Sequence, residues 1–493
     1  MVERLVANEK VEGSTPFARS NIMNNKNQLN INEIFSLALQ NQEQNNYKVA
    51  KDLYKQIIKI NPNLVEAYNN LGFIFGLEGK NEEAKECYEK AIEIKPNYIN
   101  ANQNLGLIFQ KLGEHEKAKV CYEKVISVNP DLINVQYNLG LVFQKLGNYE
   151  EAKKCYEKVI DKNPKIADAH NNLGIVFSYL GNFNQAINCY SKAIIHNRKY
   201  KKAKENLILA LTSVSSDIDN PIVKVNNELK NLHNNFVLKD FFKNENLSIF
   251  FKKSNKIIKK INNDIQDIEY QETQTYRRNL EDLNCKRHHK IFNQEKIIPK
   301  YCFSCFKIQI EPKNILELIK LFFIFDNFEF TNNNWRKCMI EIRPKVSGTY
   351  KGFIYCSSVN EANEILENLN PLLKFILINK VGIKRGCSEF YEPFPDFKEI
   401  NNKEPNFMNY ENKWENIEKK EDAKETFKQK KFLETLSGLS VSDFLIMNHW
   451  LNYAKLIEDA SYKNLCTDFI YSDYIVKEIS NQLEFRRKEF LRQ

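Results

Sequence analysis

Between about Ile31 and Leu211, apolar residues recur at spacings of three and four, which is the pattern of amphipathic helices. In one stretch Leu71 and Phe75 share a face, and Gly79 follows them. The next stretch carries a second apolar stripe, made of Ala84, Cys87, Tyr88, Ala91 and Ile92. Pro96 then ends this stretch because proline has no amide proton to donate. The pattern therefore predicts a pair of helices.

This pair of helices returns every 34 residues. Four cysteines in near-identical segments mark the period: Cys87, Cys121, Cys155 and Cys189. A single pair cannot bury both of its apolar stripes, so we expect successive pairs to stack and cover one another.

Each repeat resembles the tetratricopeptide repeat, a helical hairpin of this length. The matching residues of the clearest repeat are Leu71, Gly72, Phe75, Ala84, Tyr88, Ala91 and Pro96. By this phasing the full repeats span residues 65–98, 99–132, 133–166 and 167–200. A degenerate repeat precedes them at 31–64, and a capping helix follows at 201–212. The resemblance implies an all-α superhelix of about five repeats plus the cap, over residues 31–212.

A polar column repeats with the same period. Its members are Asn70, Asn104, Asn138, Asn172 and Asn206. The resemblance places this column on the concave surface, where a similar asparagine ladder in O-linked N-acetylglucosamine transferases holds a peptide backbone. A side-chain amide both donates and accepts, so a row of amides can bind an extended chain without reading its side chains. We expect peptide binding here and no packing role, although solvated helix residues of an asparagine-rich chain are the alternative.

After the repeats the pattern changes. Residues 213–222 have the composition of a linker, and 223–269 return to helical spacing. Between 300 and 392, strands and helices are predicted in the order β-α-β-β-α-β, with CFKIQIEP as the first strand and KVGIKRGC as the last. This order predicts a ferredoxin-like sandwich within an α+β domain at 270–400. A charged connector is expected at 401–430 and C-terminal helices at 431–493, with Ser440 capping one of them.

Composition narrows the class of protein. With 42% hydrophobic and 27% charged residues the chain has the character of a soluble globular protein, and no apolar run is long enough to cross a membrane. The net charge of +9 comes without a nucleic-acid-binding motif, so nucleic acid is an unlikely partner. Four of the 11 cysteines are repeat-core residues, which predicts a reducing cytoplasm. Lysine and asparagine are abundant throughout, so single lysines carry little weight.

The first residues do not fit the rest of the chain. Residues 1–22 have neither the apolar core of a signal peptide nor the helical periodicity that follows. They resemble the conceptual translation of a transfer RNA gene. We therefore expect a non-native extension and a native start at Met23.

One group of residues suggests a metal site. Cys285 and His288 are followed by Cys302 and Cys305, two close pairs of soft ligands such as a structural zinc ion needs. The alternative is that these cysteines are core residues.

A second group combines arginines with thiols. The arginines are Arg277, Arg278, Arg287, Arg336, Arg343 and Arg385. Guanidinium groups bind phosphate or carboxylate, and a thiol near such charge has a lowered pKa, which would concern Cys338 and Cys387. Ordinary ion pairs are the alternative for the arginines. If the domain is an enzyme, Cys387 is the expected nucleophile.

No nucleotide-binding loop, nucleophile elbow or metalloprotease motif is present in the sequence. The sequence therefore predicts an interaction protein that binds a protein or an extended peptide through the concave face of its repeats. The alternative is an enzyme whose repeats recruit a protein substrate for modification by the Cys/Arg-rich domain.

Overall fold

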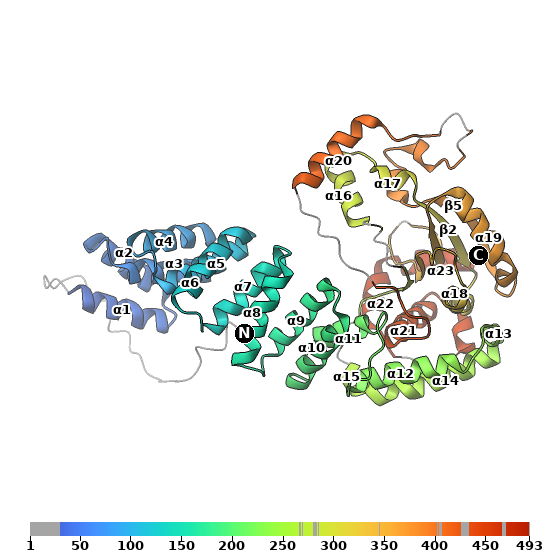
Figure 1. Ribbon diagram of the computed structural model, residues 1–493, viewed down its shortest axis with the longest axis horizontal. Coiled ribbons are helices and arrows are strands. Elements are labelled where there is room, and N and C mark those ends of the chain that lie inside the picture. The colour runs from blue at the N-terminus through green and yellow to red at the C-terminus, as the bar shows by residue number, and fades with distance from the viewer. Residues whose placement is uncertain are drawn as a thin grey trace. The chain divides into compact units, whose positions relative to one another are not determined.

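The computed structural model is shown in Figure 1. It describes residues 30–492 except 266, 267, 269, 280–282, 284, 345, 402, 404–406, 425–432 and 466–469. The predicted extension at 1–22 and the predicted start at Met23 lie outside the described residues. The chain divides into two compact units, Met1–Val142 and Phe143–Gln493, and each is described by itself.

Helical pairs make up the described part of the first unit (Figure 1). They are α1 (Ile31–Glu43) with α2 (Tyr47–Ile60), α3 (Val65–Leu77) with α4 (Asn81–Ile94), and α5 (Ile99–Leu112) with α6 (His115–Val128). A further helix, α7 (Ile133–Lys145), begins in this unit. Helices therefore start at Val65, Ile99 and Ile133, the phasing that the sequence predicts.

A glycine and a tyrosine set the close packing inside the pair α5 and α6. A Cβ atom added at Gly106 of α5 would lie 2.6 Å from Cε1 of Tyr122 in α6, so only glycine lets these helices approach so closely. Tyr122 is fully buried by this contact. Gly113 adopts a φ of +79° and ends α5, a conformation that glycine reaches without steric cost.

The second compact unit begins with the later helices of the same pattern. These are α8 (Tyr149–Lys162), α9 (Ala167–Leu180), α10 (Phe183–His196) and the capping helix α11 (Lys201–Ala210). Gly174 faces Tyr190 just as Gly106 faces Tyr122. The predicted cap is thus present as a single helix after the last pair.

Further helices follow, as the spacing at 223–269 predicts. They are α12 (Pro221–Asn234), α13 (Leu238–Phe241), α14 (Asn244–Ile258) and α15 (Asn262–Ile265), with a 3-10 turn η2 (Lys259–Ile261). Asn220 caps α12 by accepting a hydrogen bond from the Ile222 amide at 2.9 Å.

An antiparallel sheet of five strands forms the centre of the C-terminal region. The strands are β1 (Gln274–Arg277), β2 (Phe306–Pro312), β3 (Arg336–Ile340), β4 (Tyr350–Cys356) and β5 (Ile378–Arg385), in the order β1-β3-β4-β2-β5. Helix α18 (Ile315–Asn327) joins β2 to β3, and α19 (Val359–Leu373) joins β4 to β5. The four predicted strands and both helices are present, whereas β1 was not predicted.

The strand register separates the two faces of this sheet. A Cβ atom added at Gly352 of β4 would lie 2.4 Å from Leu321 of α18, so Gly352 lies under that helix. Cys338 of β3 is in register with Gly352 and shares this face. Because side chains alternate along a strand, the intervening residues lie on the second face. They include Lys307, Lys337, Lys351, Phe353, Tyr355 and Lys384, and we call this the lysine face.

Helices and short turns complete the second unit. They are α16 (Cys285–Glu295), α17 (Lys300–Phe303), η3 (Ser388–Phe390), η4 (Pro395–Lys398), α20 (Asn412–Lys424), α21 (Val441–Leu456), η5 (Ala460–Asn464), α22 (Asp473–Ile479), η6 (Ser480–Gln482) and α23 (Leu483–Leu491). The region expected to be a charged connector, 401–430, contains helix α20, which buries Trp414 in a cluster with Phe390 and Phe397. The prediction that Ser440 caps a helix is confirmed: its hydroxyl accepts from the Asp443 amide at 3.1 Å.

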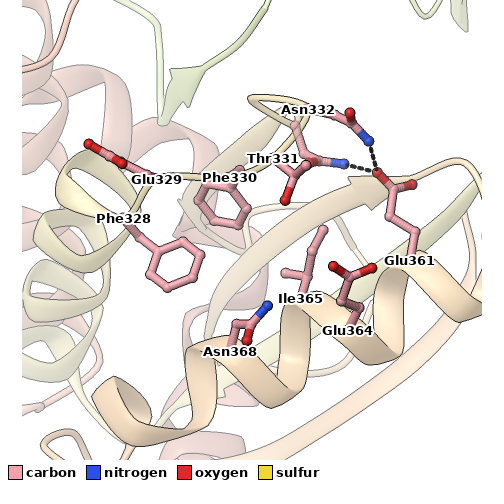
Figure 2. Close-up of a pocket in the computed structure, with 10 residues that line it drawn as sticks. Phe328, Glu329, Phe330, Thr331, Asn332, Glu361, Glu364, Ile365 and Asn368 are labelled. Atoms are coloured by element: carbon pink, nitrogen blue, oxygen red, sulfur yellow. Dashed lines mark hydrogen bonds between the residues drawn. The ribbon is translucent and has the colours of Figure 1, made fainter.

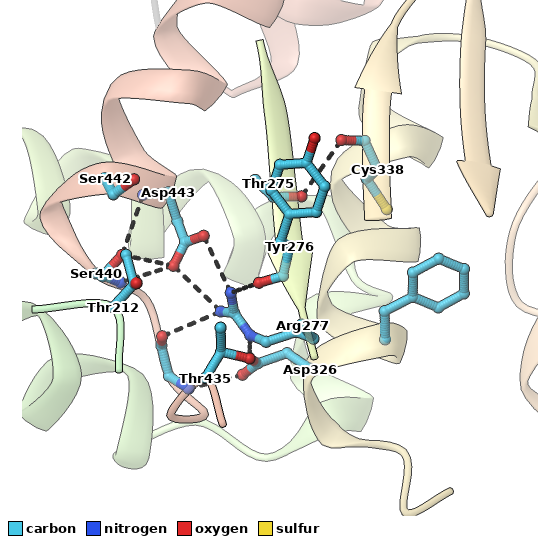
Figure 3. Close-up of polar contacts among 12 residues, drawn as sticks. Thr212, Thr275, Tyr276, Arg277, Asp326, Cys338, Thr435, Ser440, Ser442 and Asp443 are labelled. Carbon is cyan, nitrogen blue, oxygen red and sulfur yellow. Dashed lines mark hydrogen bonds and ion pairs between the residues drawn. The ribbon is translucent and has the colours of Figure 1, made fainter. Parts of the chain in front are cut away.

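One buried arginine joins three elements of this unit. Arg277 of β1 binds Asp326 of α18 and donates to both carboxylate oxygens of Asp443 in α21, each at 3.1 Å (Figure 3). Its guanidinium also lies 4.8 Å from the ring centroid of Phe322. Each of the two buried carboxylates therefore has the Arg277 guanidinium as an ion-pair partner in the interior.

Within the described part of the chain, no helix combines the length and the apolar character needed to cross a membrane.

Candidate functional site

The asparagine column lies on the first helix of each repeat. Asn70, Asn104, Asn138, Asn172 and Asn206 belong to α3, α5, α7, α9 and α11, and all five side chains are half-buried. Their neighbours in sequence, such as Leu105 and Leu207, are buried.

Hydrogen bonds link members of the column through a second asparagine. In the first unit, Nδ2 of Asn104 donates to Oδ1 of Asn69 at 3.1 Å, and Nδ2 of Asn69 donates to Oδ1 of Asn70 at 3.1 Å. Asn70 in turn donates to the Tyr54 hydroxyl at 3.2 Å. The expectation that this column has no packing role is therefore wrong, because its amides join consecutive repeats.

The second unit contains the same arrangement. Nδ2 of Asn206 donates to Oδ1 of Asn171 at 2.9 Å, and Nδ2 of Asn171 donates to Oδ1 of Asn172 at 3.3 Å. Asn104 and Asn206 each use one N–H group in this way. Among the described residues, nothing donates to their carbonyl oxygens, so these oxygens can accept from a ligand.

The lysine face concentrates positive charge around one aromatic ring. The Nζ atoms of Lys307, Lys337 and Lys384 lie 5.1, 5.5 and 5.7 Å from the ring centroid of Phe353. Each lysine comes from a different strand, and Phe353 is only 4% exposed. The alternation of the strands thus brings three cations to one place on the sheet.

No carboxylate pairs with these three lysines among the residues that the structure describes. Lys307 donates to the Gly386 carbonyl oxygen, and Lys337 donates to the side chain of Gln274 at 3.0 Å. Burial, and to a smaller extent the charge of Lys307, lower the pKa of both Lys337 and Lys384 to about 8. The lysine face therefore favours an anion.

A cysteine with an unusual environment lies next to this face. Cys387 lies two residues after the end of β5, and its Sγ atom, a ring nitrogen of His289 and a carboxylate oxygen of Glu389 lie within 4.8 Å of one another. His289, in α16, donates a hydrogen bond to Cys387, and the thiol of Cys302, in α17, donates a second one. Cys387 thus accepts from two groups on two different elements.

These contacts favour a thiolate at Cys387. The hydrogen bond from Cys302 contributes most to holding the pKa of Cys387 well below its ordinary value, and His289 and the charge of Lys307 act in the same direction. The same hydrogen bond raises the pKa of Cys302, and the bond to Cys387 raises the pKa of His289. A negative sulfur beside a positively charged imidazole is the state of an activated nucleophile.

The four predicted zinc ligands are not brought together. Cys285 and His288 lie on α16, where His288 stacks on Tyr301 at 5.2 Å, while Cys302 contacts Cys387. Among the described residues, the close group of possible ligands is His289, Cys387 and Glu389. Zinc at the four predicted residues stays a prediction.

The predicted arginines have structural partners. Arg277, Arg287 and Arg343 form ion pairs with carboxylates, and Arg336 and Arg385 donate to backbone carbonyl oxygens. Arg278 lies over the ring of Trp335 at 5.4 Å. Burial raises the pKa of Cys338, so the expected activation of this thiol by Arg336 is wrong.

A small pocket lies between the segment after α18 and the start of α19 (Figure 2). Its volume is about 190 Å³, and it is lined by Phe328, Phe330, Asn332, Glu361 and Glu364 among others. Glu361 already accepts from Asn332 at 2.9 Å and from the Ser357 amide at 2.6 Å. This carboxylate therefore serves the local fold.

Comparison with known proteins identifies the repeats. Family models of the tetratricopeptide repeat match residues 65–98, 98–164 and 131–199. Residues 65–199 are tetratricopeptide repeats. No curated protein matches the chain.

Solved structures of tetratricopeptide proteins match the same part of the chain. One is YrrB, described as a TPR protein with an unusual peptide-binding site, at 21% identity and a TM-score of 0.35, covering 36% of this chain and 92% of YrrB. Another is a MamA structure at 26% identity and a TM-score of 0.32, covering 34% and 97%. MamA from Desulfovibrio magneticus RS-1 matches at 18% identity and a TM-score of 0.33, covering 34% and 96%. These TM-scores are too low to support an argument. The assignment of the repeats therefore depends on the family models and on the phasing of the helices.

Outside the tetratricopeptide array, sequence reasoning missed most of the site. His289, Lys307, Lys337 and Lys384 were not singled out. For the three lysines, the reason is that lysine is abundant in this chain. A usable signal was nevertheless present for Lys307, which alternates with apolar residues inside the predicted strand CFKIQIEP.

Proposed function

We propose that the tetratricopeptide array binds an extended segment of a partner protein and that its asparagine column holds the peptide backbone. Tetratricopeptide repeats support a role in protein–protein interaction. The observation that favours backbone recognition is that the side-chain carbonyl oxygens of Asn104 and Asn206 accept no hydrogen bond from the described residues. Both side chains are half-buried.

The hydrogen bonds between asparagine side chains also order Asn104 and Asn206 before a ligand binds. Asn69 and Asn171 fix one N–H group of Asn104 and Asn206, so the rotamers are set before a ligand arrives. Side chains that are already ordered lose less conformational entropy on binding. An extended peptide offers a backbone N–H group to each such oxygen.

The test uses peptides selected from a random library on the full chain. A selected peptide is titrated against the wild type, Asn104→Ala and Asn206→Ala. Each variant loses one contact of about 1 kcal/mol, which corresponds to a roughly fivefold weaker affinity. Asn188→Ala is the control, since Asn188 is exposed on the second helix of its repeat. Unchanged affinity in folded Asn104→Ala and Asn206→Ala would contradict the proposal.

A second candidate function is a thiol-dependent enzyme that acts on an anionic substrate, to which the repeats recruit a protein. Cys387 would be the nucleophile, and His289 would hold the proton. The lysines of the lysine face would attract the anionic group. The observation that favours this candidate is that Lys307 lies near Cys387. Lys307 donates to the carbonyl oxygen of Gly386, and Cys387 is the next residue in the chain.

Two alkylating reagents test this candidate. Iodoacetate is anionic and iodoacetamide is neutral, so the lysine face should raise the rate ratio of the two at Cys387 above that of free cysteine. Lys384→Met removes one cation that has no polar partner among the described residues, and it should lower the ratio. A ratio equal to that of free cysteine would contradict an anion-binding site.

We also infer that residues 306–385 form a ferredoxin-like sandwich. The support is the order β-α-β-β-α-β together with the antiparallel strand order β3-β4-β2-β5. A cytoplasmic location stays a proposal, supported by the buried free thiols of the repeats at Cys121, Cys155 and Cys189.

A further inference from the structure

Two cysteines far apart in sequence meet at the edge of the sheet. Strand β2 starts opposite the end of β5, where Phe306 is paired with Arg385. The Gly386 amide continues this pairing by donating to the Cys305 carbonyl oxygen at 2.8 Å. Helix α17 comes just before β2 in the chain. The pairing of β2 with β5 therefore brings Cys302 of α17 close to Cys387, the residue after Gly386.

Cys302 and Cys387 are packed together in one hydrophobic cluster. The cluster also contains Phe292, Phe390 and Phe397, which belong to α16, η3 and η4. Cys302 is 2% exposed, whereas Cys387 is half-buried and remains accessible to a small reagent. The two thiols thus form a pair with one buried and one accessible member.

We propose that Cys302 and Cys387 are a redox-active pair, in which Cys387 reacts with a hydroperoxide and Cys302 then closes a reversible disulfide. The surroundings of the pair fit these roles. His289 and Lys307 place positive charge beside Cys387, where it stabilises a thiolate. Cys302 packs in the same cluster as Cys387 and is shielded from the reagent.

The reaction balances in two steps. The Cys387 thiolate attacks one oxygen of the hydroperoxide and the O–O bond breaks. A sulfenic acid forms, and the leaving alkoxide takes the proton held by His289 and departs as the alcohol. The sulfur of Cys302 then attacks the sulfur of Cys387, the S–S bond forms, and hydroxide leaves as water with the proton of Cys302. The two thiols lose two electrons and two protons, and the hydroperoxide is reduced to an alcohol and water. An external dithiol reverses the disulfide.

Cys305 is the natural competitor for the second role. Its Sγ atom would lie 2.3 Å from a Cβ atom at Gly386, so it is packed against the backbone just before Cys387. Burial raises the pKa of Cys305 to about 12, and it makes no hydrogen bond to Cys387 among the described contacts. Cys305→Ser is therefore the matched control for Cys302→Ser.

The experiment treats the reduced full chain with hydrogen peroxide, blocks free thiols with N-ethylmaleimide and digests it with trypsin. The expected product joins peptide Tyr301–Lys307 to peptide Gly386–Lys398, and dithiothreitol separates them. Fragmentation of this product assigns the bond to Cys302 or to Cys305 without any variant. Cys302→Ser should abolish the cross-link, and Cys305→Ser should keep it.

Three results would overturn the proposal. The first is a cross-link that fragmentation assigns to Cys305. The second is the absence of a cross-link in the folded wild type while Cys387 proceeds to sulfinic acid. The third is the absence of any oxidation at Cys387 under conditions that oxidise free cysteine.

Discussion

At the scale of single residues, the distance to the neighbouring helix decides which side chains a position can accept. Gly106 and Gly76 both lie within helices of the repeats, yet they differ in the room above them. A Cβ atom at Gly106 would lie 2.6 Å from Tyr122, whereas one at Gly76 would lie 3.7 Å from Ile108, an ordinary contact. The two glycines therefore allow a matched comparison.

We predict opposite effects for alanine at these positions. Gly106→Ala should lower the free energy of unfolding by about 1–3 kcal/mol, because the added methyl group overpacks a buried tyrosine. Gly76→Ala should raise it by about 0.5–1 kcal/mol, since alanine favours a helix more than glycine does. Chemical denaturation of the two variants measures both. A loss of stability in both variants would show that the spacing at Gly106 is not the cause.

The charged state of the Cys387 thiol is a second property that can be tested at the scale of single residues. The groups facing its sulfur are Cys302, His289 and Lys307, which favour the thiolate, while burial and Glu389 oppose it. We predict that iodoacetamide modifies Cys387 at a pH well below the ordinary thiol pKa of about 8.5. Cys302→Ala should move the profile to higher pH because the strongest hydrogen bond to the thiolate is lost.

Mass spectrometry of tryptic peptides over a pH series measures this profile. Cys305 is the internal control, since burial raises its pKa to about 12 and its reaction should need strongly alkaline solution. Equal profiles for Cys387 and Cys305 would contradict the environment described for Cys387.

At the scale of secondary structure elements, β1, α18 and α21 are joined by the ion pairs of Arg277 (Figure 3). We predict that Arg277→Met destabilises the second unit by about 3–5 kcal/mol, because two buried carboxylates lose their partner. Lys488→Met is the control. Lys488 pairs with Glu484, and their side chains are 64% and 82% exposed, so solvent screening keeps the cost of this substitution well below that of Arg277→Met. Similar unfolding midpoints for the two variants would contradict the role of the buried network.

Most elements could be predicted from periodicity, and the exceptions have physical reasons. The helices of the repeats bury one face each, and β2 and β4 are buried along almost their whole length, so both leave a clear apolar pattern. Strand β1 has four residues, too few for an alternation to stand out. Helix α20 is mostly charged, and its packing depends on Trp414, whose ring contacts include Phe303 and Phe394, both well outside the helix in sequence.

At the scale of the whole chain, the sequence predicts where the repeats are but only part of what they hold. The phasing of helix starts at Val65, Ile99, Ile133, Ala167 and Lys201 follows from local pattern alone. The bridging role of Asn69 and Asn171 does not, because it depends on contacts between repeats. The same holds for Cys387, whose partners His289 and Cys302 come from other elements.

The central claim is that the asparagine column recognises a peptide backbone and not its side chains. It is tested most directly by titrating the full chain with two series of variants of one selected peptide. One series replaces single side chains by alanine, and the other methylates single backbone nitrogens. We predict that alanine changes the affinity little, whereas N-methylation at a contacted residue weakens it at least fivefold, since each lost hydrogen bond costs about 1 kcal/mol. Strong losses on alanine substitution with tolerance of N-methylation would contradict the account.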